Sequence, residues 1–220
     1  MDIAKYIDHT NVKPTATAGD IKKLCQEAKK FGFHSVCVTP TYVKLAKRLL
    51  IGSKVKTIVV IGFPHGSETT VTKAVATKEA IKNGAEEIDF VMNIGLMKDK
   101  KYQLVKKEMQ AVKKAAGLRN VKVILETGYL TKSEIKKACQ LAKQAGLDFV
   151  KTCTGFGPGQ AKVEDIKLMR RAVGPKIGVK ASGGIRDYQT AIKMIKAGAN
   201  RIGTSAGVEI VVGGKSKNAY

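Results

Sequence analysis

Eight short apolar runs rich in β-branched residues recur along the chain, and each has the length of a buried strand. Segments with helical periodicity separate them. Consecutive runs begin roughly 22 to 34 residues apart, which fits one strand plus one covering helix. The runs are Tyr6–His9, Ser35–Thr39, Thr57–Phe63, Glu87–Asn93, Val121–Thr127, Asp148–Thr154, Ile177–Ser182 and Arg201–Ser205. Strict alternation of strand and helix predicts an α/β fold with parallel strands.

Residues typical of helix ends support this pattern. Thr17–Asp20 and Thr131–Glu134 have the spacing of capping boxes, which mark the start of a helix. Glycines stand where the helices should end, and these are Gly32, Gly84, Gly117, Gly146, Gly174 and Gly198. The predicted helices therefore begin and end between the apolar runs.

The number of units favours a closed barrel over an open sheet. We predict a single-domain parallel (β/α)8 TIM barrel over residues 1–212, followed by a flexible glycine-rich tail over 213–220. An open doubly wound sheet is the alternative, but no Gly-x-Gly-x-x-Gly follows the first strand. The chain has no tryptophan, so its core must consist mainly of aliphatic side chains, as in a barrel.

The formal net charge of +22 raises the question of an anionic partner. The lysines recur on the polar faces of predicted helices, and no aromatic residues interleave with them as a base-stacking surface requires. We therefore expect no specific nucleic-acid partner. A polyanion-binding module remains an alternative, and it predicts salt-sensitive binding without catalytic turnover.

Several features indicate a cytoplasmic protein without metal or cofactor. No run approaches the ~18 apolar residues of a membrane span, and no signal peptide is recognised, so we expect no membrane partner. The four cysteines lack zinc or redox spacing, which favours free thiols, and they are Cys25, Cys37, Cys139 and Cys153. The histidines offer no ligand pair, and they are His9, His34 and His65.

Two lysines interrupt neighbouring apolar runs, and barrel enzymes carry their catalytic groups at the strand ends. Lys151 and Lys180 each precede a loop that contains glycine. A desolvated lysine beside a second cation has a depressed pKa, so that its neutral amine can attack a carbonyl and form a Schiff base. For either lysine alone, a structural ion pair is the favoured interpretation. The two together favour catalysis.

Acidic and amide residues in other strands are candidates for the same site. Asp89 lies in an apolar strand and can bridge the two lysines and relay protons, or it can serve only as their neutralising partner. Asp8 and Asn11 end the first strand, where they can bind substrate hydroxyls or form a turn before Pro14.

The last two strands are followed by glycine-rich loops, Ser182–Ile185 and Gly203–Gly207. Barrels often bind phosphate after strands seven and eight, where backbone N–H groups are free of obstructing side chains. Gly155 in the preceding loop adds another donor. We therefore predict a phosphate site. No Gly-x-Ser-x-Gly elbow is present to suggest a serine hydrolase.

Five blocks in the same order resemble the 2-deoxy-D-ribose-5-phosphate aldolase family from about Tyr6 to the C-terminus. They are Ile7–Thr10 with Lys13-Pro14, Glu87–Asp89 with Asn93–Gly95, Val150–Thr152 with Thr154–Gly157, Val179–Arg186, and Arg201–Ser205. The resemblance implies reversible cleavage of 2-deoxyribose 5-phosphate to acetaldehyde and glyceraldehyde 3-phosphate, in deoxyribose phosphate catabolism. It implies a class I aldolase that uses neither a metal nor another cofactor.

The resemblance also implies residue roles. Lys151 would form the Schiff base, Lys180 would lower its pKa, and Asp89 would join the proton relay. A C-terminal tyrosine, here Tyr220, assists proton transfer in some members. We place in the substrate pocket Asp8, Asn11, Cys37 and Thr152. The phosphate-binding positions are Gly155, Gly183, Gly184, Thr204 and Ser205.

The chain departs from the family pattern in two places near the site. Cys153 replaces the usual serine, and Pro158–Gln160 replaces small residues, which bears on substrate range and loop mobility. Association as a homodimer or a homotetramer is compatible with the sequence. Another phosphate-binding barrel enzyme, an isomerase or a synthase, is the second hypothesis, although it would not need both lysines.

Overall fold

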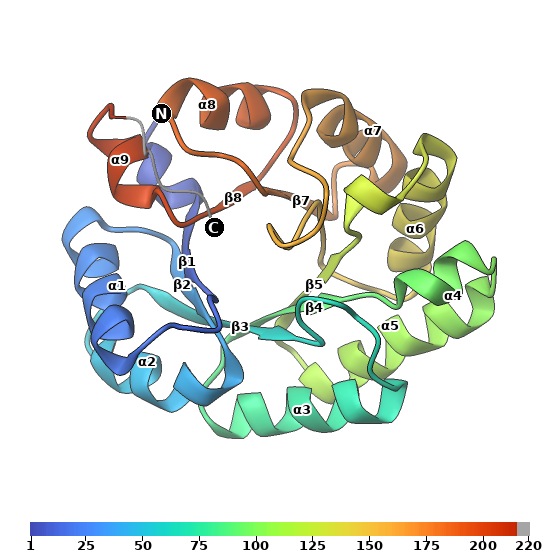
Figure 1. Ribbon diagram of the computed structural model, residues 1–220, viewed down its shortest axis with the longest axis horizontal. Coiled ribbons are helices and arrows are strands. Elements are labelled where there is room, and N and C mark those ends of the chain that lie inside the picture. The colour runs from blue at the N-terminus through green and yellow to red at the C-terminus, as the bar shows by residue number, and fades with distance from the viewer. Residues whose placement is uncertain (215–220) are drawn as a thin grey trace.

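The computed structural model describes residues 1–214, and its eight strands form a closed parallel barrel (Figure 1). Each strand pairs with the next along the chain, and β8 pairs with β1 to close the barrel. The strands are β1 Ile7–Asn11, β2 Ser35–Val38, β3 Lys56–Ile61, β4 Glu87–Val91, β5 Asn120–Ile124, β6 Phe149–Lys151, β7 Gly178–Ser182 and β8 Arg201–Thr204. The predicted barrel is confirmed, and the open sheet is excluded for these residues.

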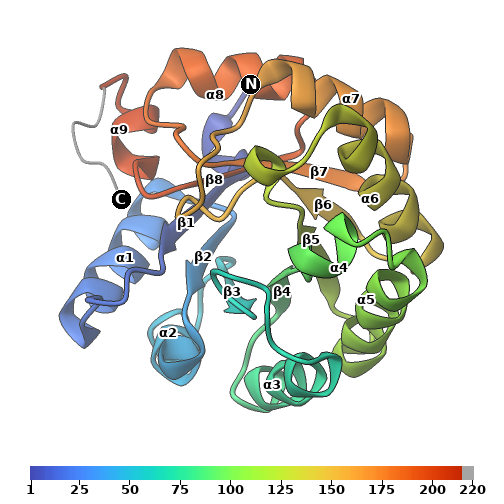
Figure 2. The same ribbon diagram turned by 45° about the vertical axis from the view of Figure 1, so that its right-hand side comes forward.

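Helices surround the strands on their outer side, as the two views in Figures 1 and 2 show. They are α1 Ala18–Phe31, α2 Val43–Leu49, α3 Thr70–Lys82, α4 Ile94–Lys98, α5 Tyr102–Ala116, α6 Lys132–Gln144, α7 Val163–Val173, α8 Tyr188–Lys196 and α9 Gly207–Val211. Short 3-10 turns occupy Ile3–Tyr6, Pro40–Tyr42 and Thr127–Tyr129. No helix in this part of the chain is long and apolar enough to cross a membrane.

The predicted helix ends are confirmed. Thr17 and Thr131 form reciprocal capping boxes at the starts of α1 and α6. The six predicted glycines stand at helix ends, three as the C-cap itself and three one residue beyond it. The first three are Gly32, Gly117 and Gly174, and the others are Gly84, Gly146 and Gly198.

The predicted strand limits differ from the observed ones mainly at the carboxyl ends. The run predicted as Asp148–Thr154 forms a ladder only over Phe149–Lys151, yet Thr152 and Thr154 are buried. Loops at the mouth of the barrel pack over the strand ends, so an apolar or buried residue there need not belong to the sheet. The first strand differs in the other direction, since its ladder extends through Asn11, which pairs with Val38.

Side chains on the two faces of the strands differ in character. The large apolar core lies between the strands and the helices, as alternation along each strand requires. Inside the barrel, a small apolar cluster of Val12, Cys37, Ile58 and Val60 contacts Phe63. Much of the remaining interior is charged, including Asp8, Asp89 and Lys180. The fold therefore places ionisable groups in the centre of the molecule.

The α6 cap gives a test of the local structure. Thr131→Ala removes the hydroxyl that accepts from the Glu134 backbone N–H, at 3.2 Å. We expect a loss of about 1 kcal/mol in the free energy of unfolding and a Tm lower by ~2–4 °C, measured by thermal unfolding. Thr131→Ser keeps the hydroxyl and should match the parent protein. An equal loss in both variants would contradict the capping role.

Candidate active site

The structure brings together the three residues predicted to carry the chemistry. Lys151 and Lys180 are paired in the register of β6 and β7, and both side chains reach Asp89 on β4. Lys151 Nζ donates to Asp89 Oδ2 at 2.9 Å, and Lys180 Nζ donates to the same oxygen at 2.8 Å. One carboxylate oxygen is therefore shared by two lysines inside the barrel.

Six charged side chains form a closed ring of alternating sign, the charge ring, consisting of Asp89, Lys180, Asp8, Arg201, Glu87 and Lys122. In that order around the ring, the closest N–O distances are 2.8, 2.6, 2.6, 3.1, 2.5 and, from Lys122 back to Asp89, 3.0 Å. Each member has an oppositely charged neighbour on both sides. The three carboxylates balance the three cations, and Lys151 is attached to the ring through Asp89.

Burial and charge act in opposite directions on these groups. Burial alone would raise the pKa of Asp89, but Lys122, Lys151 and Lys180 outweigh it and hold that pKa well below its usual value. Burial alone would lower the pKa of Lys180, but the carboxylates of Asp8 and Asp89 raise it above its usual value. At neutral pH Asp89 is therefore a carboxylate and Lys180 an ammonium ion.

The sequence reasoning did not single out three members of the charge ring. Lys122 lies between two valines on β5, which is the same signal that identified Lys151. Glu87 precedes Asp89 by two residues and so faces the same side of β4. Applying the period of two to every charged residue in a strand would have found them, and Arg201 as well.

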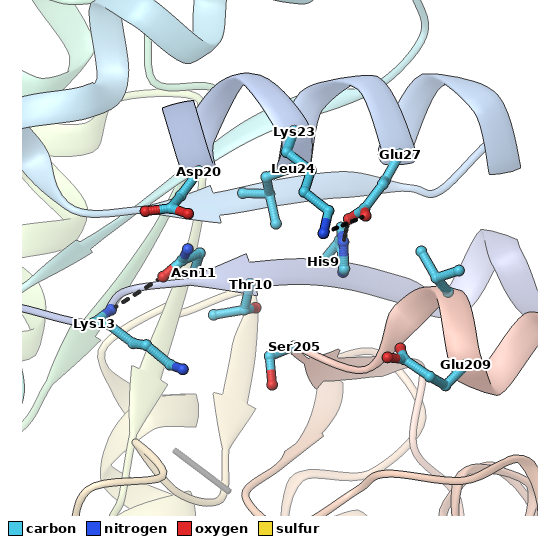
Figure 3. Close-up of a pocket in the computed structure, with 11 residues that line it drawn as sticks. His9, Thr10, Asn11, Lys13, Asp20, Lys23, Leu24, Glu27, Ser205 and Glu209 are labelled. Carbon is cyan, nitrogen blue, oxygen red and sulfur yellow. Dashed lines mark hydrogen bonds and ion pairs between the residues drawn. The ribbon is translucent and has the colours of Figure 1, made fainter. Parts of the chain in front are cut away.

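Asp8 and Asn11 lie on opposite faces of β1. Asp8 is fully buried in the charge ring, where Ser35 Oγ and Arg201 Nη1 each donate to its Oδ1 at 2.6 Å. Asn11 instead lines a surface pocket between α1 and α9 with Ser205 (Figure 3). The structure therefore brings Asp8, but not Asn11, into contact with Lys180.

The two other proposed pocket residues, Cys37 and Thr152, are both fully buried. Cys37 lies inside the barrel on β2, and burial, with Asp89 contributing, raises the pKa of its thiol to about 11. Thr152 Oγ1 donates to the Ser182 carbonyl at 2.7 Å and accepts from the Ser182 N–H at 2.9 Å. Thr152 therefore joins the end of β6 to that of β7.

A second pocket lies at the carboxyl ends of β6, β7 and β8. All five predicted phosphate positions line it, and these are Gly155, Gly183, Gly184, Thr204 and Ser205. Gln160, which belongs to the segment that departs from the family pattern, also lines this pocket. A Cβ on Gly184 would lie 2.6 Å from the Gln160 side chain. Arg186, for which the sequence pattern indicated no role, adds a cation.

Glu126, which the sequence reasoning also missed, forms hydrogen bonds with the loop after β6. Glu126 has a left-handed backbone with φ 53°, an uncommon conformation for a residue other than glycine. Its Oε2 accepts from the Thr154 N–H at 3.0 Å and from the Thr154 hydroxyl. Gly157 lies against the Glu126 carboxyl group, so a side chain there would collide with it. This contact fixes the loop that carries Gly155.

Two of the sequence predictions are not decided by these contacts. Tyr220 lies outside the described residues, so its role in proton transfer stays a prediction. Within residues 1–214, no group of three His, Cys, Asp or Glu side chains is arranged to hold a metal ion.

Comparison with known proteins places this geometry in a family. Residues 3–212 match the family model described as DeoC/LacD family aldolase. The deoxyribose-phosphate aldolase of Clostridium tetani is 58% identical over 212 residues, which cover 96% of this chain and 98% of the relative. That of Thermococcus gammatolerans is 57% identical over 220 residues, covering 98% of each chain.

Solved structures agree. The tetrameric deoxyribose phosphate aldolase of Aeropyrum pernix superimposes with a TM-score of 0.87 at 32% identity, covering 96% of this chain and 89% of the other. A structure described as QR15, an aldolase, gives 0.93 at 43% identity, covering 96% and 95%. The family match over residues 3–212 spans the whole barrel. The chain belongs to the DeoC/LacD family of aldolases.

Proposed function

We propose that the protein is a lyase that reversibly cleaves 2-deoxy-D-ribose 5-phosphate to acetaldehyde and D-glyceraldehyde 3-phosphate, through a Schiff base on Lys151. The observation that carries this proposal is the pair of lysines on one buried carboxylate oxygen, near a glycine-rich pocket that can bind phosphate. Its family relatives are named for the same substrate.

Lys151 is the lysine best placed to meet a substrate. It ends β6 and is 4% exposed, whereas Lys122 and Lys180 are fully buried. The neutral amine of Lys151 attacks the aldehyde carbon of the open-chain sugar, and loss of water gives the imine. Lys180 stays bonded to Asp8 and Asp89, and its positive charge lies beside the reacting nitrogen.

Cleavage then requires two proton transfers. A base removes the proton from the C3 hydroxyl, the C2–C3 bond breaks, and its electron pair passes to the protonated imine to form an enamine. The enamine carbon next takes up a proton, and water hydrolyses the resulting imine to release acetaldehyde. Asp89 bridges Lys151 and Lys180, so these groups, with water, can move the protons.

The second pocket suits the phosphate group of the sugar. Its glycines allow a ligand to approach the backbone N–H groups closely, and Arg186 and the hydroxyl of Ser205 add further donors. The Thr204 hydroxyl instead donates to the Ile185 carbonyl at 2.7 Å and so shapes the loop. Barrel enzymes commonly bind phosphate after strands seven and eight. The sugar would then extend from this pocket toward Lys151.

Two further assignments belong to this proposal. We infer assembly as a homodimer or a homotetramer, which the tetrameric structure of the Aeropyrum pernix relative supports. We also infer a cytoplasmic location, because all four cysteines are free and buried.

Lys151→Leu tests the Schiff base. The change removes the only proposed nucleophile, so turnover and borohydride trapping of acetaldehyde should both be abolished, as measured by an aldolase assay and by mass spectrometry. Lys167→Leu, at an exposed lysine on α7, is the matched control and should trap acetaldehyde normally. A folded Lys151→Leu protein that still cleaves the sugar phosphate would end the assignment.

Ser205→Glu tests the phosphate site. A carboxylate at this position should repel the substrate phosphate, so KM for 2-deoxyribose 5-phosphate should rise by roughly 10-fold or more. Activity on unphosphorylated deoxyribose should fall much less. Ser205→Gln matches the size without the charge and should show a small effect. Equal losses on both sugars in the Glu variant would place the anion site elsewhere.

Cys37 provides a test based on pH. Unsaturated aldehydes formed from acetaldehyde react with thiolates, and the pKa of about 11 keeps Cys37 mostly protonated at pH 7. Inactivation by such an aldehyde should therefore accelerate about 10-fold per pH unit between pH 7 and 9. Cys37→Ala should resist it, whereas Cys139→Ala, on α6, should behave like the parent. An adduct mapped to Cys25, Cys139 or Cys153 would contradict this prediction.

A further inference from the structure

We propose that Lys122, supported by Glu87 and Arg201, is a positioning residue that holds the Asp89 carboxylate in its charged, working orientation. This inference rests on the proposed function, because it concerns the carboxylate that serves Lys151. Lys122 itself is fully buried. It acts through Asp89 rather than by contact with substrate.

The first argument is how the two oxygens of Asp89 are divided. Oδ2 accepts hydrogen bonds from both Lys151 and Lys180, whereas Oδ1 lies 3.0 Å from Lys122 Nζ. The Lys122 contact lacks the direction of a hydrogen bond, so it acts as an ion pair. Asp89 and Lys122 are also direct partners in the β4–β5 ladder, which fixes their separation. Without Lys122, Oδ1 has no cation beside it, and the carboxylate can tilt away from the position in which Oδ2 accepts from both lysines.

The second argument is that Lys122 is itself fixed. Its Nζ lies 2.5 Å from Glu87 Oε2, and Glu87 accepts from Arg201 Nη2 at 3.1 Å on both oxygens. Arg201 also forms an ion pair with Asp8, which in turn pairs with Lys180. His34 and Lys56 contact Glu87 from the other end of the barrel, at 3.5 and 3.3 Å. The far half of the ring therefore forms a rigid support for the half that meets Lys151.

The third argument concerns charge. The titratable groups that face Asp89 from other strands are Asp8 on β1, Cys37 on β2, Lys122 on β5, Lys151 on β6 and Lys180 on β7. β3 adds the apolar Val60, its ladder partner. Among these groups, Lys122 is the cation at Oδ1. Its removal would leave three ring carboxylates facing two ring cations.

The sign of the pH effect follows from this charge balance. The folded-state pKa of Asp89 lies below its usual value, so the active carboxylate form persists until the pH falls through that pKa. Loss of Lys122 should raise the pKa of Asp89. Activity should then be lost at a higher pH on the acid side.

Lys122→Met is the test, because methionine keeps an unbranched chain without the charge. We expect kcat for 2-deoxyribose 5-phosphate to fall about 100-fold while KM changes by less than about threefold. The acid limb of the kcat/KM profile should move up by about one pH unit. Borohydride trapping on Lys151 should persist at alkaline pH.

A matched control exists outside the barrel. Lys73 and Glu108 form another buried pair, at 2.6 Å, between α3 and α5. We expect both Lys73→Met and Lys122→Met to lower the Tm, because each leaves a buried carboxylate without its cation. Lys73→Met should do so without moving the acid limb. The double variant Glu87→Gln/Lys122→Met restores charge balance in the ring, so it should regain Tm but keep the shifted limb. If Lys122→Met alone does not fold, the double variant takes its place in the pH and kcat measurements.

Three results would overturn the inference. An unmoved acid limb with kcat within about twofold of the parent would make Lys122 a structural residue only. An equal shift in Lys73→Met would show that the limb reports loosening of the whole fold. A double variant with a normal acid limb would show that Asp89 does not need the Lys122 charge. Failure of the proposed function is read separately, from borohydride trapping in the parent protein.

Discussion

Enclosing six alternating charges inside the barrel is the constraint on which the site depends. A buried charge is costly unless it is paired, and an ion pair repays its desolvation only with good geometry. The charge ring supplies the pairing, because each member touches an opposite charge on both sides. A closed set of parallel strands makes this arrangement feasible, since it directs side chains from β1, β4, β5, β7 and β8 toward a common interior.

The polar interior has a consequence for stability. Most apolar packing lies between strands and helices, where the large core joins residues of all eight strands to the helices outside them. The interior contributes a small apolar cluster around Ile58 and Val60. Stability and chemistry are thus separated into two layers of the same strands, and the outer layer holds the fold while the inner layer carries the charges.

The loops at the mouth depend on a second set of buried contacts. Lys73 donates to the carbonyls of Gly66 and Val91, and Glu108 accepts from the Asn93 N–H, which fixes the segments after β3 and β4. Glu126 does the same for the loop after β6. Because the loop after β6 lines the anion pocket and follows Lys151, its support by Glu126 holds this part of the pocket at a constant separation from the amine.

The sequence alone predicted the barrel fold and two of the lysines in the site. The period of apolar runs, the capping boxes and the helix-ending glycines defined the barrel, and lysines in apolar strands pointed to Lys151 and Lys180. Only the tertiary structure decided which charges meet. Arg201 donates to Asp8 across 193 positions of the chain, because β8 closes on β1. The tertiary structure also shows that Asn11 lies on the face opposite Asp8 and that the ladder of β6 ends at Lys151. Local sequence patterns indicate which residues are buried and which face of a strand they occupy. The contacts between distant charged residues depend on the register in which the barrel closes, and the strand ends depend on the loops that pack over the mouth of the barrel.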